Sequence, residues 1–411
     1  MKTLSGTRVK PMLMVVFINI IGFFLLYFYY KAEIFSVVEC GAALCAINIA
    51  VYFIMSRFEL GDVYMFLMVS MLVSIGCIML FRIDADKGKN QVIWFCIGVG
   101  VFFVSYFVYR IFKKWNMLTY FYMALSFALF VVTLVFARAV AGSRNWIMIG
   151  KLSVQPSEFI KVLYAFTMAC FYSKKESSVA KLNKKLLGVS YKDWLLFCYV
   201  YICLGFLVLQ REWGTAVLFM LVYFTMQLLY DANIRLIILN TVLAVLGSVG
   251  GYFLTPHIKV RVSTWLDPWA DATNKGYQIV QSLTAIASGG YFGTGIGNGD
   301  PYFIPEVHSD FIFSAICEEM GMFIGVAIIM LYFIFSYRGF KIALKTHNEF
   351  NKALSVALVS CFAYQTFIIV GGVIKMIPLT GITLPFVSYG GSSMVSSFIM
   401  LGILTSISHN A

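Results

Sequence analysis

The sequence predicts an all-α polytopic membrane protein with about twelve transmembrane helices. Hydrophobic residues make up 61% of the 411 residues and charged residues only 12%, a balance that soluble globular proteins of this length do not show. Runs of about 20 apolar residues, the length that a helix needs to cross a bilayer, recur along the chain. The alternating pattern of a transmembrane barrel is absent from the sequence, so the spans are predicted to be helices.

The predicted spans are these apolar runs, and polar or charged residues separate them. They cover about residues 11–30, 34–56, 62–81, 91–112, 117–137, 155–173, 191–209, 213–230, 234–254, 311–336, 353–374 and 385–407. The basic N-terminus runs into the first span without a small-residue cleavage site before Lys31. We therefore expect this first span to be retained and not removed as a signal peptide.

The charge pattern predicts the orientation of the chain. A net charge of +12 would suggest nucleic-acid binding in a soluble domain, but the basic residues here lie mainly in short loops between spans. Such residues set topology and face anionic membrane lipid, so no nucleic-acid partner is expected. Bases concentrate in alternate loops, which predicts that both termini are cytoplasmic and that residues 138–154, 255–309 and 375–384 lie outside.

The loop at residues 255–309 is longer than a connection between two spans requires, so we expect it to be functional. The apolar spacing of Ile279, Leu283 and Ile286 predicts a short amphipathic helix within it. Glycines recur from residue 289 to residue 299, which predicts a turn-rich segment near the membrane face.

A first polar group enters a predicted span at Gln155, followed by Ser157, Glu158 and Lys161. Glu158 and Lys161 are three residues apart and therefore lie on one helix face. One interpretation is a helix start with an internal ion pair. The other is a polar cavity or pathway, because ionisable residues below the membrane interface are costly and usually functional.

A second polar group lies in the segment from Pro301 to Gly321, where Glu306, His308 and Asp310 lead directly into an apolar run. Ionisable groups thus stand where a membrane helix meets water, the place where a lipid-linked substrate would react. Ser309 is predicted to cap the following helix, with Asp310 in its first turn, where the helix dipole favours an anion. This capping interpretation and a catalytic role for Asp310 both fit the pattern.

A third group runs from Lys375 to Ser393 and contains two prolines and three glycines. It predicts irregular backbone at the entry to the last span, which the membrane tolerates only where the backbone is buried or lines a cavity. Ser388 and its hydroxyl-bearing neighbours would donate hydrogen bonds there. Glycine and serine also serve close packing of helices, which is the alternative.

Together these segments resemble the SEDS family (shape, elongation, division and sporulation), typified by RodA, FtsW and SpoVE. The resemblance covers roughly residues 60–407 and runs in family order through RNWIMIG, QPSEFIK, GYQIVQS, IPEVHSDFIF, EEMG and TGITLPFVSYGGSS. The family core has ten spans. Residues 1–58 are therefore predicted to be two additional N-terminal helices outside the catalytic core, serving docking or insertion, and residues 59–411 the polymerase core. Where many members have Gln-Pro-Asp, this chain has Gln210, Arg211 and Glu212, which keeps the acid but not the proline.

The resemblance implies a peptidoglycan glycosyltransferase that polymerises lipid II at the outer face of the bacterial cytoplasmic membrane. Asp310 matches the family's catalytic aspartate and would act as general base on the acceptor hydroxyl. The substrate-binding residues implied are Arg144, Trp146, Gln155, Ser157, Glu158, Lys161, Lys259, Arg261, Glu306, His308 and Ser388. Partners implied are lipid II, the growing glycan strand and a transpeptidase of the class B penicillin-binding proteins.

The leaving pyrophosphate would need positive charge, and Arg144, Lys259 and Arg261 are the outward-facing candidates. A divalent cation, Mg²⁺ or Mn²⁺, stays an open alternative, although the sequence contains no carboxylate cluster that marks a metal site. The nine cysteines all fall in apolar runs without metal-type spacing, so we expect neither metal ligands nor disulfides among them.

Two other functions fit the same features. A lipid II flippase would also use intramembrane charges but needs a path from one face to the other, whereas the ionisable residues here concentrate in the outer half. A non-catalytic scaffold for a transpeptidase would need none of them.

Overall fold

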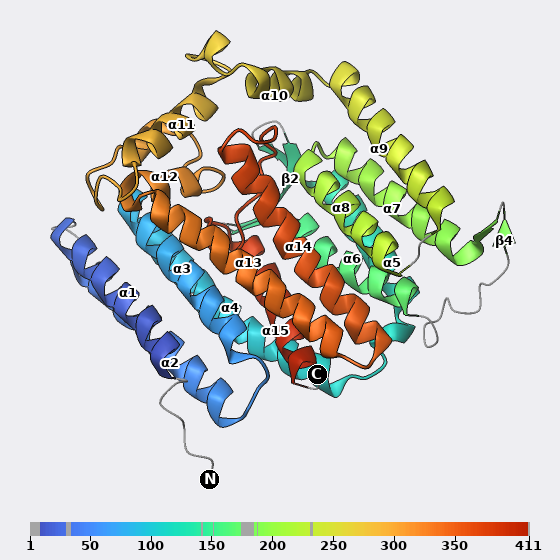
Figure 1. The fold of residues 1–411 in the computed structure, drawn as a ribbon, viewed down its shortest axis with the longest axis horizontal. Coiled ribbons are helices and arrows are strands. Elements are labelled where there is room, and N and C mark those ends of the chain that lie inside the picture. Colours follow the sequence, from blue (N-terminus) through green and yellow to red (C-terminus); the bar gives the residue numbers. More distant parts are fainter. Residues whose placement is uncertain are drawn as a thin grey trace. The chain divides into compact units, whose positions relative to one another are not determined.

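The computed structural model describes residues 9–29, 34–140, 143–150, 152–173, 185–186, 188–230 and 233–409. This part of the chain is almost entirely helical (Figure 1). The elements in order are α1 (Val9–Tyr29), α2 (Ile34–Arg57), α3 (Val63–Ile83), α4 (Ala85–Ile111), η1 (Trp115–Met117), α5 (Thr119–Phe136), β1 (Arg138–Val140), β2 (Ser143–Ile149), β3 (Leu152–Val154), α6 (Pro156–Tyr172), β4 (Lys185–Leu186), β5 (Val189–Ser190), α7 (Tyr191–Leu209), α8 (Trp213–Tyr230), α9 (Ile234–Leu254), α10 (Pro256–Leu266), η2 (Trp269–Asp271), α11 (Tyr277–Gly289), η3 (Pro301–Phe303), α12 (Ile312–Met320), α13 (Met322–Lys345), α14 (Glu349–Val373) and α15 (Gly391–Ser408).

The predicted class, an all-α polytopic membrane protein, is confirmed. Within the described residues, eleven helices are long and apolar enough to cross a membrane. Helix α6, which corresponds to the predicted span 155–173, has 17 residues and is the one predicted span that falls short of this length. The backbone forms two compact units, one of residues Met1–Arg110, Val280–Arg338 and Thr383–Asn410, and one of residues Ile111–Ile279 and Gly339–Ile382.

The first unit is built around α3, whose residues are mostly buried. Helices α1 and α2 pack against each other and against α3, and α12 and α15 also contact α3 (Figure 1). The contact of α1 with α3 includes a polar pair, because Asn19 Nδ2 donates a hydrogen bond to Ser74 Oγ at 2.8 Å. Such interhelical hydrogen bonds hold apolar helices together where hydrophobic burial alone gives little preference. The predicted division after residue 58 stays a prediction, but this unit includes the elements on both sides of it.

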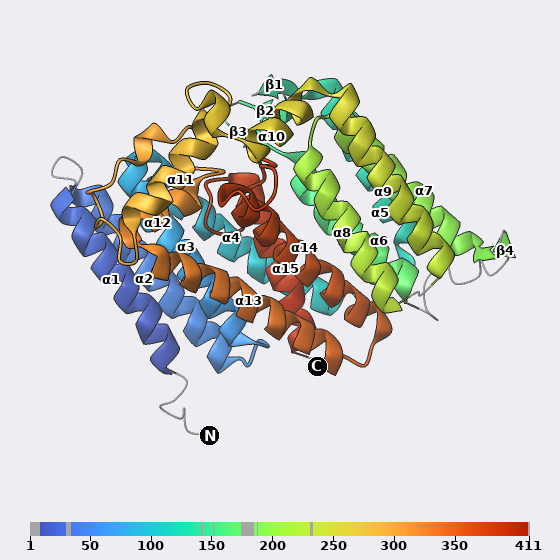
Figure 2. The same cartoon turned by 45° about the horizontal axis from the view of Figure 1, so that its top comes forward.

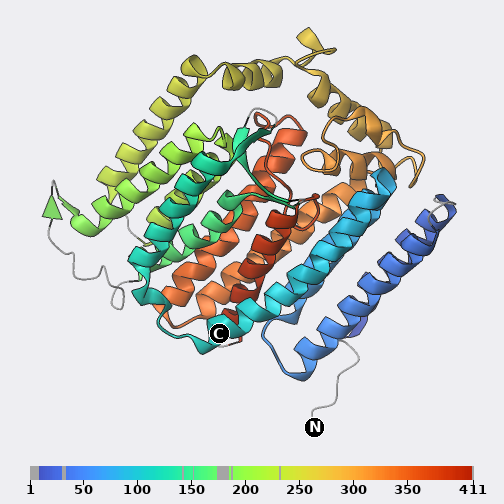
Figure 3. The same ribbon diagram turned by 180° about the vertical axis from the view of Figure 1, so that it is seen from behind.

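The second unit is built around α6, which packs against α5, α8 and α14. The three-stranded antiparallel sheet β1-β2-β3 lies at the ends of α5 and α6, and β2 contacts both helices (Figure 3). Helix α9 contacts α8 and α10 and has most of its surface exposed, as its position in Figure 2 illustrates.

Three expectations about boundaries need correction. The run 311–336 is not one helix, because it is divided at Gly321 into α12 and α13, and α13 continues to Lys345. The last span begins at Gly391 and not at residue 385, since residues 375–390 form the irregular backbone that their prolines and glycines predict. The segment 255–309 contains the predicted amphipathic helix as α11 but also a second helix, α10, which the sequence pattern did not indicate.

Candidate functional site

Asp310 lies in a turn between η3 and α12, two residues before the helix begins, and its side chain is partly buried. Its backbone N–H donates to the carbonyl oxygen of Glu306 at 3.2 Å. The expected capping by Ser309 is wrong. The position that precedes α12 is Phe311, without a side-chain cap, and the Ser309 hydroxyl instead donates back to the Glu306 carbonyl at 3.3 Å. Asp310 is therefore outside the helix, on a turn that leaves its carboxylate accessible.

The turn that carries Asp310 is held by the segment before α15. Ser388 Oγ donates to the Ser309 carbonyl oxygen at 2.6 Å and accepts from the Leu384 backbone N–H at 2.9 Å. The Tyr389 backbone N–H donates to the His308 carbonyl oxygen at 2.9 Å. Ser388 is only 3% exposed, so its place in the structure suits positioning of the turn better than contact with a substrate.

Helix α4 contributes two residues to this site that the sequence analysis missed. Lys87 Nζ lies 3.3 Å from His308 Nδ1, and Gln91 Nε2 donates to the Ser388 carbonyl oxygen at 3.1 Å. An ammonium group can only donate, so His308 Nδ1 is the acceptor. The available signal was the polar run that starts at Asp84, directly after the third span and on the predicted outer side.

The surroundings of His308 favour its neutral form. Burial, and after it the positive charge of Lys87, lower the pKa of His308, while the nearby carboxylates of Glu306 and Asp84 oppose the shift. The Glu306 carboxylate lies 3.6 Å from His308 Nε2 and is exposed, so solvent screens its effect on the pKa of His308. The group thus combines a partly exposed carboxylate at Asp310 with a neutral imidazole and an ammonium group.

In the second unit, Gln155 and Ser157 converge on Glu212. The Oε1 atom of Glu212 accepts hydrogen bonds from Asn145 Nδ2 at 2.5 Å, Gln155 Nε2 at 2.6 Å and Ser157 Oγ at 3.1 Å. Burial raises the pKa of Glu212, and the three hydrogen bonds oppose that rise. In the sequence, Glu212 stands out only as the acid kept where the proline is lost, and Asn145 is not among the predicted site residues.

The ion pair, one of the two interpretations of this polar group, is present at the start of α6. Lys161 Nζ lies 2.8 Å from Glu158 Oε2 and also donates to Gln365 Oε1 of α14 at 2.8 Å. The Lys161 side chain is only 2% exposed, so its charge is satisfied inside the helix bundle. This arrangement explains how the lysine can be buried, since buried charges persist where they are paired and hydrogen-bonded.

The predicted cations are less closely grouped. Arg261 on α10 donates from Nη1 to the Leu379 carbonyl oxygen at 3.0 Å, and Lys259 on the same helix is exposed. Trp265 Nε1 also donates, to the Lys375 carbonyl oxygen at 3.1 Å, so α10 is fixed to the irregular segment after α14. Arg144 lies on β2, but its side chain is outside the part that the structure describes, and its neighbour Trp146 is partly buried.

The predicted site residues therefore form two groups, in different compact units. Glu306, His308, Asp310 and Ser388 come together in the first, whereas the second holds Gln155, Ser157, Glu158 and Lys161, together with the cations of α10. Among the described residues, no three His, Cys, Asp or Glu side chains form a group that could hold a metal ion.

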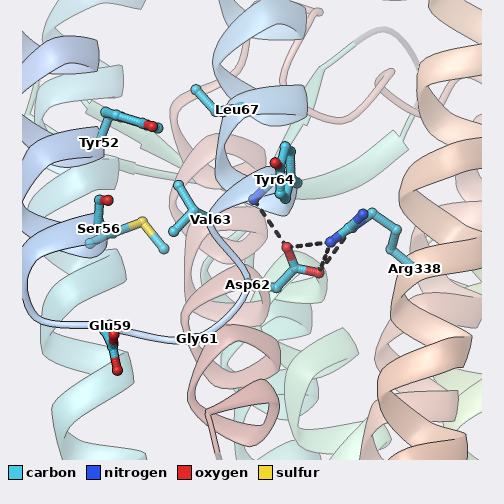
Figure 4. A pocket seen from close by; sticks show the side chains of 10 residues that line it. Tyr52, Ser56, Glu59, Gly61, Asp62, Val63, Tyr64, Leu67 and Arg338 are labelled. Carbon is cyan, nitrogen blue, oxygen red and sulfur yellow. Dashed lines mark hydrogen bonds and ion pairs between the residues drawn. The ribbon is translucent and has the colours of Figure 1, made fainter. Parts of the chain in front are cut away.

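A cavity of about 490 Å³ opens at the other end of α3, between the end of α2, the α2–α3 turn and Arg338 of α13 (Figure 4). Asp62 caps α3 by accepting from the Tyr64 N–H at 3.0 Å and binds Arg338 through both carboxylate oxygens, at 2.7 and 2.8 Å. Helix α3 has 21 residues, so this cavity is about 30 Å along the helix from the end that faces the Asp310 turn.

The chain is similar to known proteins over most of its length. A sequence family described as cell cycle protein, which groups FtsW, RodA and SpoVE, matches residues 53–411. The peptidoglycan glycosyltransferase RodA of Mycobacterium bovis is 34% identical over 361 residues, which are 84% of this chain and 77% of that protein. The stage V sporulation protein E of Bacillus subtilis is 31% identical over 366 residues, 84% of this chain and 96% of that protein. A chain from a peptidoglycan synthase complex that coordinates polymerization and crosslinking shares the fold, with a TM-score of 0.68 at 22% identity over 85% of this chain and 98% of that chain.

Proposed function

Because the chain belongs to the FtsW, RodA and SpoVE family of cell cycle proteins, we propose that it is a peptidoglycan glycosyltransferase that polymerises lipid II. The reaction takes place at the outer face of the bacterial cytoplasmic membrane and builds glycan strands for growth, division or sporulation. The observation that carries the proposal is the position of Asp310. Asp310 is partly exposed on a turn that the Ser388 hydroxyl and the Tyr389 N–H hold through the carbonyl oxygens of Ser309 and His308.

In the proposed mechanism, Asp310 accepts the proton of the acceptor sugar's 4-hydroxyl group as its oxygen attacks the anomeric carbon of the donor chain. The bond between that carbon and the pyrophosphate oxygen breaks, and the lipid pyrophosphate leaves with the electron pair. Attack opposite the leaving group inverts an α-linkage to the β-linked glycan. Two residues before Asp310, His308 accepts from the Lys87 ammonium group, and this contact helps to fix the turn.

The charge that develops on the pyrophosphate requires cations, for which Arg261 and Lys259 on α10, with Arg144 on β2, are the proposed residues. A divalent cation would supply the same neutralisation. Among the described residues, no group of three His, Cys, Asp or Glu side chains could hold one.

A transpeptidase of the class B penicillin-binding proteins is the proposed partner. The support is the similarity to a chain of a peptidoglycan synthase complex whose polymerization and crosslinking are coordinated. Glycan strands need to be crosslinked after polymerisation, so a polymerase of this kind gains from a crosslinking partner held nearby.

The test uses purified protein in lipid vesicles with labelled lipid II, assayed for glycan ladders and separately for lipid translocation. We expect glycan from the wild type and a loss of about 10²–10⁴-fold in Asp310→Asn, since this is the usual contribution of a general base. Asn keeps the size and hydrogen-bonding capacity of the side chain, so binding of lipid II should persist. Asp86→Asn is the matched control, because that carboxylate is 85% exposed and lies 3.8 Å from Lys89.

Translocation without glycan would instead identify a flippase. A folded Asp310→Asn variant that makes glycan at the wild-type rate would remove Asp310 from the mechanism.

A further inference from the structure

Arg82, at the last turn of α3, is enclosed by groups from four parts of the first unit. Its guanidinium Nε lies 2.9 Å from Glu319 Oε1 of α12, and its Nη2 donates to the Gly299 carbonyl oxygen at 2.9 Å. Its Nη1 donates to the Tyr302 hydroxyl at 3.0 Å. Arg82 is only 2% exposed, and the Glu319 side chain is fully buried, so both charges depend on these contacts.

Tyr29, the last residue of α1, covers the guanidinium. The centre of its ring lies 4.5 Å from Arg82 Cζ, and the ring of Tyr302 lies 5.4 Å from the same atom. A cation at this distance from an aromatic face is attracted by the electrons of the ring, most strongly where water is excluded. One of the two rings that hold Arg82 therefore comes from the N-terminal helix pair.

Tyr29 also touches the glycine-rich segment directly. A Cβ atom at Gly297 would lie 2.7 Å from Tyr29 Cδ2, closer than any side chain tolerates, so the ring lies against bare backbone. Gly297 has a φ of 94°, which only glycine adopts without strain, and its N–H donates to Glu319 Oε2 at 3.0 Å. Tyr29 and Glu319 thus both contact Gly297.

This network reaches the turn of Asp310 from both sides. Upstream, Gly297, Gly299 and Tyr302 are fixed to Arg82 and Glu319, and the Asp300 N–H donates to Glu318 Oε1 at 3.0 Å. Downstream, α12 begins two residues after Asp310 and carries Glu318 and Glu319. Hydrogen bonds therefore join the first residues of the segment 297–319 to its last two residues. We call this the closed segment, and Asp310 lies within it.

The turn that joins α2 to α3 is tied to the end of α15. His409 Nδ1 lies 2.8 Å from the Glu59 carbonyl oxygen, and Ser408 Oγ accepts from the Asp62 N–H at 2.9 Å. Helices α1 and α2 themselves pack against α3, where Asn19 Nδ2 donates to Ser74 Oγ at 2.8 Å, so the pair contacts the core at more than its Tyr29 end.

We propose that the N-terminal helix pair is part of the catalytic apparatus and that Tyr29 is a positioning residue. It holds Arg82 and Gly297, and through them the closed segment that carries Asp310. This inference rests on the proposed function for its effect on activity, but its effect on the segment itself is independent of that function.

The experiment compares Tyr29→Leu, which keeps apolar bulk but removes the aromatic face, with Tyr29→Phe, which keeps the ring. Phe28→Ala is the matched control, since Phe28 is an exposed aromatic residue in the same helix turn, 61% accessible. Full-length proteins are assayed for glycan synthesis from lipid II and for hydrogen exchange of backbone amides in residues 293–303.

We expect Tyr29→Leu to lower kcat about three- to fivefold at unchanged KM, since Tyr29 is 41% exposed and its cation–aromatic contact is only partly shielded from water. Exchange in residues 293–303 should rise in this variant, while Tyr29→Phe and Phe28→Ala should stay near wild type in both measurements. In an Arg82→Lys background, which lacks the planar guanidinium, Tyr29→Leu should cause little further loss, because the two residues act as a unit.

Wild-type kcat and wild-type exchange in a folded Tyr29→Leu protein would overturn the proposal. Equal losses in Tyr29→Leu and Phe28→Ala would also overturn it, since they would indicate a general packing effect. If the wild type makes no glycan, the proposed function fails, and the exchange measurement alone decides the role of Tyr29.

Discussion

At the scale of single residues, carboxylates of similar chemistry occupy opposite environments in this protein. Asp310 is partly exposed on a turn, whereas Glu212 is buried and accepts three hydrogen bonds through one oxygen atom. Glu319 is buried as well, but it is paired with Arg82. A general base has to reach solvent and substrate, so the surroundings favour Asp310 for chemistry and the two glutamates for holding segments together.

The His308–Lys87 contact predicts a pH dependence. Since burial and Lys87 lower the pKa of His308, its neutral form is favoured in the folded protein. The resulting stability is present above the ordinary histidine pKa of about 6.5 and is lost as the pH falls from there through the lower folded value. Lys87→Met removes one cause of the shift, so the acidic limb of the pH–rate profile should move to higher pH.

His308→Gln is the control, because glutamine can still accept from Lys87 but does not titrate in this range. Measured initial rates of glycan synthesis between pH 5 and 8 would decide the matter. Profiles of Lys87→Met and wild type that superimpose would show that His308 does not govern this limb.

At the scale of elements, the break between α12 and α13 is the feature that shapes the site. The Met322 and Phe323 N–H groups, which a continuous helix would use internally, donate to the carbonyl oxygens of Gly290 and Tyr291 at 3.0 and 3.2 Å. The glycine-rich segment after α11 thus takes the place of a helix turn. Gly321 makes this possible with a φ of 86°.

Gly321→Ala should therefore be strongly destabilising. Its Cβ would lie 2.4 Å from the Phe292 carbonyl carbon and 2.5 Å from the Gly293 nitrogen, in a backbone region that costs alanine about 1–3 kcal/mol even without a clash. The control is Gly100→Ala in α4, where nothing lies within 4 Å and alanine should be neutral or favourable by about 0.5–1 kcal/mol. Melting temperatures of the purified proteins measure both. A Gly321→Ala protein as stable as Gly100→Ala would mean that the break does not depend on this backbone conformation.

At the scale of the whole molecule, the proposed reaction requires that the segment 255–309 lies at the outer face of the membrane, where lipid-linked sugars are polymerised into the cell wall. The distribution of basic residues predicts this orientation, with both termini in the cytoplasm. The proposed polymerase activity therefore depends on the predicted topology, because the Asp310 turn directly follows this segment.

An introduced cysteine tests the orientation in intact cells. Asn274→Cys, at an exposed position between η2 and α11, should react with a membrane-impermeant thiol reagent, and His347→Cys, exposed between α13 and α14, should be protected. Permeabilised cells should label at both positions. The reverse pattern would place residues 255–309 in the cytoplasm and remove the basis for polymerisation outside.

The sequence by itself determined the membrane class, the approximate positions of most spans and the placement of Glu158 and Lys161 on one helix face, because run length and three-residue spacing are local properties of the chain. It also located Asp310, through the polar segment that enters an apolar run. The tertiary structure alone decided that Ser309 does not cap α12, since the turn in which the N–H groups of residues 309–311 donate to the Glu306 carbonyl oxygen delays the helix to Ile312.

Only the tertiary structure could show what holds the site. The turn of Asp310 is fixed by Ser388, 79 positions away from Ser309, and Arg82 is enclosed by residues that lie 53 positions before it and more than 200 after it. No period or motif in the sequence links such residues, because which buried charge meets which partner depends on how distant helices pack. The sequence therefore marked the residue that we propose for the chemistry, and the packing of α3, α12 and the segment before α15 decided which groups surround its turn.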